Sequence, residues 1–143
     1  MIKDLKKRYF MLLSPALLGF FLTGTAKESG WIFPCPFGRS LFFSKLLFVL
    51  AALTAMAGPV LVRTVFAHGV RNNKQVDPEV FLKFEMRLLY IVLTTPWFAL
   101  AAYGCDFEKF YTAGIVLMAL YAAYYYYPSE KRINFDKRIF RVK

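Results

Sequence analysis

Four apolar stretches without a charged residue dominate the sequence. Each is 17–19 residues long, and they cover 9–26, 46–62, 88–105 and 110–128. At 1.5 Å per residue, a helix of this length covers about 26–28 Å, close to the roughly 30 Å hydrocarbon core of a bilayer. Each stretch is apolar on every side, which is typical of a helix surrounded by an apolar solvent. The pattern predicts an all-α membrane protein with residues 1–143 forming a single transmembrane domain. Its expected spans are about 9–26, 44–66, 86–105 and 109–127.

Capping residues and prolines refine the predicted ends and bends of these helices. Asp77-Pro78-Glu79 combines an N-cap acceptor, a proline at the first helical position and an acid in the first turn. The third helix should therefore begin near Pro78 and continue to Gly104. Prolines should kink the first and third helices, and the neighbouring hydroxyls of Ser14 and Thr95 could bond to the freed carbonyls.

Small residues recur at helical spacing in two of the spans. The second span holds Ala51, Ala55 and Gly58, and the fourth holds Ala119 and Ala123. Such residues let helices approach closely. The sequence leaves open whether the contact lies within one chain or between two copies.

The basic residues predict an orientation. Fifteen of the 19 Lys and Arg residues fall in the amino-terminal segment, in the middle loop with its flanks, or in the tail. The opposite side holds only Lys27, Arg39, Lys45 and Lys109. The positive-inside rule then predicts two helical hairpins with both termini and the loop 67–85 in the cytoplasm, in a bacterial inner (cytoplasmic) membrane. Alternatively, the first span is a cleaved signal peptide, since residues 1–8 are basic and Gly24-Thr25-Ala26 offers small residues.

The net charge of +10 indicates attraction to anionic lipids. Outside the spans, the sequence shows no basic face with stacking aromatics, so we expect no nucleic-acid partner. The basic tail, 129–143, predicts a short amphipathic helix at the membrane interface, with Phe135, Ile139 and Val142 on one face. The alternative is that this face docks on a cytoplasmic partner.

Aromatic residues near the span ends are expected to anchor the chain at the membrane interface. These anchors are Trp31, Phe37, Tyr124 and Tyr127, with Phe135 and Ile139 on the tail. Alternatively, the hydrophobic segment around Trp31 and Phe37 is a surface patch that binds a partner protein.

The two cysteines, Cys35 and Cys105, fall on the side opposite the termini. A disulfide between them is therefore a hypothesis, provided that this compartment is oxidising. The alternative is two small buried hydrophobic side chains.

Residues that could carry chemistry are few. No span has a charged residue near its centre, which argues against a proton or ion relay. With one histidine and two cysteines, we expect no metal site and no cofactor. The remaining candidate, for an anionic ligand or a lipid headgroup, is the cytoplasmic cluster Arg63, His68, Arg71, Glu85 and Arg87. The alternative is a polar junction that fixes the topology and caps helix ends, with Arg63 on the second helix and Glu85 on the third paired across the two helices.

The six residues Ala67–Asn72 resemble the polar helix-2 motif of the membrane-associated eicosanoid and glutathione metabolism family. The acidic-arginine pair that opens the family's motif is missing, because Leu61-Val62 precedes Arg63. We therefore do not assign the chain to that family. The resemblance would imply a trimeric enzyme using Arg63, His68 and Glu85.

The expected function is a non-catalytic membrane subunit or scaffold that acts through other membrane proteins or through self-association. One alternative is a small-solute or lipid transporter, although a transporter is expected to carry polar groups at the membrane midplane. Another is a glutathione- or lipid-using membrane enzyme with a cytoplasmic-side site.

Overall fold

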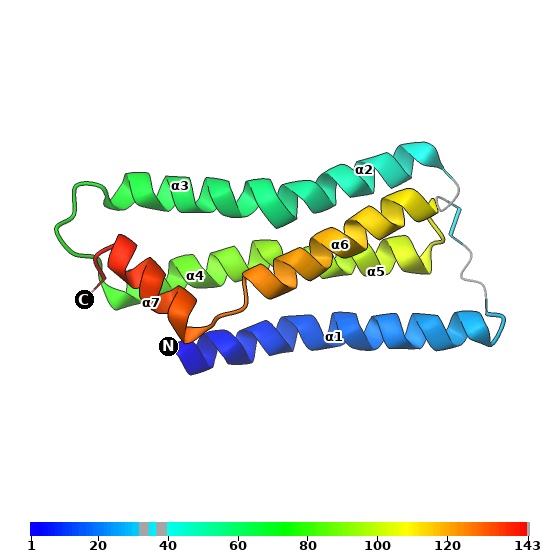
Figure 1. Ribbon diagram of the computed structural model, residues 1–143, viewed down its shortest axis with the longest axis horizontal. Helices are drawn as coiled ribbons and strands as arrows, with labels where there is room; N and C mark the ends of the chain where they lie inside the picture. Colours follow the sequence, from blue (N-terminus) through cyan, green and yellow to red (C-terminus); the bar gives the residue numbers. More distant parts are fainter. Residues whose placement is uncertain (32–34, 37–39, 143) are drawn as a thin grey trace.

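The computed structural model describes residues 1–31, 35–36 and 40–142. The described residues form long helices packed side by side, joined by short connections (Figure 1). In chain order these are α1 (Ile2–Glu28), α2 (Leu41–Ala52), η1 (Leu53–Ala57), α3 (Gly58–Val70), α4 (Pro78–Val92), α5 (Thr95–Gly104), α6 (Lys109–Tyr125) and α7 (Glu130–Ile139).

Three helical segments are long and apolar enough to cross a membrane, namely Ile2–Glu28, Leu41–Val70 and Pro78–Gly104. They coincide with the first three predicted spans. The fourth predicted span corresponds to α6, whose 17 residues extend about 26 Å within the same bundle. Exposed large apolar side chains such as Phe21, Val65 and Phe110 cover the sides of the bundle. An all-helical protein with such sides is suited to a lipid environment.

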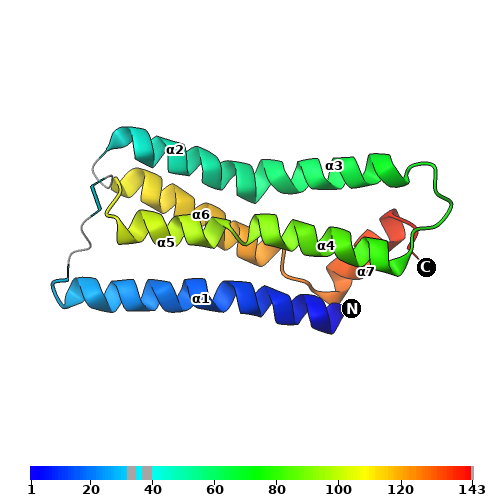
Figure 2. The same ribbon diagram turned by 180° about the vertical axis from the view of Figure 1, so that it is seen from behind.

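The packing order differs from that of two self-contained hairpins. α1 contacts mainly α5 and also α4, whereas α2 packs against α6 and α5, and α3 packs against α4. Figures 1 and 2 show α1 and the α2–α3 segment on opposite sides of the bundle, with α4, α5 and α6 between them. The connection between α1 and α2 spans 29–40, and twelve residues can extend about 40 Å. It is therefore long enough to cross the end of the bundle.

Small residues permit the close helix contacts, all within one chain. Ala51, Ala55 and Ala119 are buried. A Cβ atom at Gly58 would lie 2.8 Å from Cγ2 of Ile91, so glycine allows α3 to approach α4. The small-residue positions expected from the sequence are thus used largely inside the chain.

The prolines act differently in the first and third helices. α1 remains helical through Pro15. In the third helix the α-helical pattern breaks between Val92 and Thr95, just before Pro96. Thr94 Oγ1 donates to the carbonyl of Ile91 there, at 2.6 Å.

The hydroxyl of Thr95 has a different partner from the predicted one. Its Oγ1 lies 2.9 Å from Oγ1 of Thr54, which belongs to the π-helical turn η1. The irregular turns of two neighbouring helices are therefore linked near mid-bundle.

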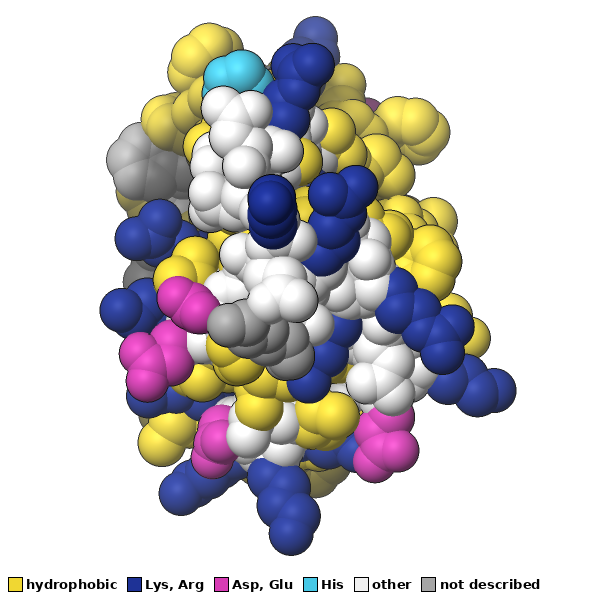
Figure 3. Space-filling view, turned by 90° about the vertical axis from the view of Figure 1, so that its left-hand side faces the viewer, with side chains coloured by type: hydrophobic (Ala, Val, Ile, Leu, Met, Phe, Trp, Pro, Cys, Tyr) yellow, Lys and Arg dark blue, Asp and Glu magenta, His cyan; other side chains and the backbone are white. Residues whose placement is uncertain are grey.

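Both termini lie at the same end of the bundle as the loop between α3 and α4 (Figure 1). Lys and Arg side chains gather on this end, while apolar side chains lie around its edges (Figure 3). We call it the basic end. At the opposite end, Cys35 forms a disulfide with Cys105, with their Cα atoms 5.3 Å apart. The disulfide fixes the connection between α1 and α2 to the residue that follows α5.

Candidate functional site

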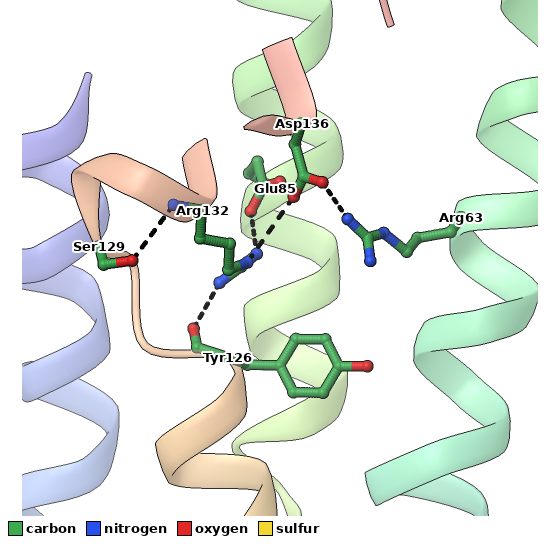
Figure 4. A network of polar contacts seen from close by, with 6 residues as sticks. All are labelled: Arg63, Glu85, Tyr126, Ser129, Arg132 and Asp136. Atoms are coloured by element: carbon green, nitrogen blue, oxygen red, sulfur yellow. Dashed lines mark hydrogen bonds and ion pairs between the residues drawn. The ribbon is translucent and has the colours of Figure 1, made fainter. Parts of the chain in front are cut away.

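Four charged side chains meet at the basic end in one network (Figure 4). Arg63 comes from α3, Glu85 from α4, and Arg132 and Asp136 from α7. Arg63 pairs with Asp136, and Arg132 pairs with Glu85. The network therefore joins three helices that are far apart in the sequence.

The local sequence of α7 positions its two members. Ser129 is the N-cap, and its hydroxyl accepts a hydrogen bond from the backbone N–H of Arg132 at 3.3 Å. Arg132 and Asp136 are one turn apart, so their side chains lie on the same face of the helix. Ile133, which is fully buried, lies on this side of α7 as well. α7 thus packs against the bundle through one face that carries both charged and apolar side chains.

Arg132 lies at the centre of the network. Besides Glu85, it donates through Nη1 to the backbone carbonyl of Tyr126 at 2.6 Å, and its Nε lies 3.7 Å from Oδ2 of Asp136. Its guanidinium also lies over the ring of Tyr126, 5.5 Å from the ring centroid. An arginine has five donors in a planar fork, which suits a residue that must satisfy several acceptors at once.

The network is balanced in charge, and its two acids are shielded from solvent. It contains two cations and two anions, and Glu85 and Asp136 are fully buried. Removing one partner from such a group leaves an unpaired buried charge, which is strongly destabilising. Glu85 Oε1 and Asp136 Oδ2 have no hydrogen-bond partner, although both carboxylates also have an oxygen paired with arginine. The arrangement is suited to locking α7 onto the bundle.

The predicted cytoplasmic cluster divides into two groups. Arg63 and Glu85 join the buried network, through α7 and not through each other. His68, Arg71 and Arg87 are exposed and make no ion pair within the part of the chain that the structure describes. An enzyme using Arg63, His68 and Glu85 together would require this network to open.

Sequence reasoning missed the two network members on α7. The sequence predicts only a basic amphipathic helix in this tail and gives Arg132 and Asp136 no role of their own. A usable signal exists, because Asp136 is an acid inside a basic tail and stands four residues after Arg132. An isolated acid in such a position, one turn from an arginine and three residues after Ile133, is a candidate for an internal ion pair.

The tail helix orients its apolar residues in two directions. Phe135 and Ile139 are exposed, as an interfacial anchor would be. Val142, which was expected on the same face, instead lies beside Val76 in an isolated β-bridge next to the bundle. Phe140 contacts the rings of Phe66 and Phe84. One side of the tail therefore docks on the bundle and the other remains free.

The other predicted anchors lie in different surroundings. Trp31 and Tyr124 are highly exposed, whereas Tyr127 packs edge-to-face against Tyr9 with ring centroids 5.3 Å apart. Phe37 lies outside the described residues.

Neither a metal-ligand cluster nor a related protein is found for the residues that the structure describes. Within 1–31, 35–36 and 40–142, no group of three or more His, Cys, Asp or Glu side chains could hold a metal ion. Comparison with protein-family models, curated proteins and solved structures finds no match to this chain.

Proposed function

We propose that this chain is a four-span integral membrane protein with both termini in the cytoplasm, and that it acts as a non-catalytic subunit or scaffold for other membrane proteins. The observation that carries the proposal is the docking of α7. Arg63 and Glu85 are committed to Asp136 and Arg132, so the charged groups hold a helix in place and are not free for a substrate.

Two separate features support the orientation. Lys and Arg side chains gather at the basic end (Figure 3), as expected for the cytoplasmic side. The disulfide between Cys35 and Cys105 lies at the other end, and disulfides persist in oxidising compartments such as the periplasm. Charge and redox chemistry therefore favour the same orientation. In this arrangement α6 is the fourth span and the free face of α7 lies at the inner interface.

Single cysteines introduced at two exposed lysines test the orientation. Both native cysteines are in the disulfide, so a maleimide would label only the introduced thiol. With a membrane-impermeant maleimide on intact cells, we expect Lys109→Cys to react and Lys74→Cys to react only after permeabilisation. The reverse labelling pattern would overturn the orientation.

The docked tail helix presents a fixed and partly basic surface at the inner membrane interface. Lys131 and Arg138 are exposed on α7, while its other side is held by the network. A helix that is already ordered loses little conformational entropy on binding, which favours its use in recognition. We infer that a partner subunit contacts this surface.

Extraction of the full chain in native-lipid polymer discs, followed by cross-linking and mass measurement, tests the scaffold role. We expect a stoichiometric second subunit, or a second copy, beyond the 16.5 kDa chain. Recovery of that subunit should fall in K131E/R138E and remain normal in K109E, a control at the opposite end. A chain that remains monomeric in cross-linked membranes would contradict this function.

A transporter is the second candidate, favoured by the irregular turns at mid-bundle. The turn Leu53–Ala57 and the break before Thr95 are joined by the hydroxyl pair of Thr54 and Thr95. Interrupted helices near the midplane are typical of transporters. Solute flux across vesicles containing the purified chain, absent with Thr95→Pro, would favour this candidate over the scaffold.

A further inference from the structure

A groove of about 800 Å³ runs between α3 and α4 on the side of the bundle. Its apolar lining includes Leu61, Val65, Phe66 and Ile91. The groove extends from Leu61 to Val70 along α3, which is about 14 Å of helix, and reaches Asn73 in the loop that follows. Its volume lies in the range of ligand pockets, roughly 300–1,000 Å³. An elongated apolar groove parallel to the helix axes runs in the same direction as the acyl chains of a bilayer that these helices would span.

Two cations line the same groove toward the basic end. Lys83 and Arg87 stand one turn apart on one face of α4, and both are exposed. Neither makes an ion pair with any residue that the structure describes, whereas Arg63 is paired with Asp136 and Arg132 with Glu85. The nearest acid before them on this helix, Glu79, is exposed in the first turn. The groove therefore offers positive charge that the chain itself does not neutralise.

Tyr90 adds an aromatic ring and a hydroxyl group to the groove lining. Its hydroxyl accepts a hydrogen bond from Nη1 of Arg8 at 2.9 Å. A third cation, Arg8, is thereby bonded to one residue of the groove lining. From Lys83 to Ile91 the lining changes from charged to apolar, which is the order of headgroup and acyl chain in a phospholipid.

We propose that this groove binds one anionic phospholipid, with its phosphate at Lys83 and Arg87 and an acyl chain along Leu61, Val65 and Ile91. Basic pockets between membrane helices are suited to anionic headgroups, and a guanidinium matches the geometry of a phosphate. The walls favour a lipid over a partner helix, because close helix contacts use small residues and Gly69 is the one small residue among the described lining positions. The site requires only that the chain lies in a bilayer, in either orientation.

Native mass spectrometry and thermal unfolding of the full chain in neutral detergent test the proposal. We expect one phosphatidylglycerol to remain bound and to raise the Tm, with no shift from phosphatidylcholine. K83Q/R87Q should weaken the binding about 30-fold, the factor that two basic contacts of ordinary strength supply. K3Q/K7Q removes the same charge from exposed positions at the same end, and should bind normally. Equal binding by both double variants would overturn the site.

Three further measurements distinguish a lipid from other occupants of the groove. Val65→Trp fills the apolar part of the groove and leaves both cations, so it should also abolish the shift. Inorganic phosphate should give no Tm shift, and a shift equal to that of the lipid would indicate a site for a free anion and contradict the proposal. A photo-crosslinker at position 65 should label lipid in membranes. Labelling of a second copy or another protein instead would also contradict it, while leaving the scaffold role intact.

Discussion

Replacing Arg132 by methionine removes the central cation of the network but keeps most of the side-chain volume. Arg132 is 14% exposed, and its partner Glu85 is 1% exposed, so the remaining carboxylate cannot be solvated while α7 is docked. Breaking a buried pair by removing one partner costs roughly 3–5 kcal/mol. The variant also leaves two anions, on Glu85 and Asp136, with only Arg63 to balance them. We expect α7 to open far more often than in the wild-type protein.

Amide hydrogen exchange of α7 measures this opening directly. Since 1.4 kcal/mol is a factor of ten, exchange of the α7 amides should accelerate about 10²–10⁴-fold, while exchange in α5 changes little. The double variant E85M/R132M leaves the neutral pair of Arg63 and Asp136, and should be less destabilised than R132M alone. Lys131→Met on the exposed side of α7 is the control. Wild-type exchange in R132M, or simple additivity in the double variant, would refute the reasoning.

The remaining predictions concern the far end of the bundle and one helix contact. Replacing Cys35 and Cys105 by serine opens a link between residues 70 positions apart, and should lower the free energy of unfolding by roughly 4 kcal/mol. Intact mass with an alkylating agent should show two free thiols in wild-type protein only after reduction. Gly58→Ala places a Cβ 2.8 Å from Ile91 and should cost about 1–3 kcal/mol. Gly69→Ala, where no atom lies within 4 Å of the new Cβ, should leave the Tm unchanged or slightly raised.

Much of the helical framework follows from local pattern. The start of α4 at Pro78 and the end of α5 at Gly104 were both predicted, because proline at the first helical position and glycine at a helix end act through the local backbone; the Asp77 side chain makes no capping hydrogen bond. The three longest spans were also predicted, because an uninterrupted apolar run of that length has few alternatives to a membrane helix. The distribution of charge could likewise be read from the chain without knowledge of its packing.

What the sequence alone determined is therefore the position of most helices and the distribution of charge between their ends. The tertiary structure decided which helices are neighbours: it placed α1 against α5, and it closed the network of Arg63, Glu85, Arg132 and Asp136. The physical reason is that helices form from contacts a few residues apart, whereas these pairs join residues 47 and 73 positions apart. Their geometry depends on the crossing of helices and on the path of the long connection, and no local pattern specifies either.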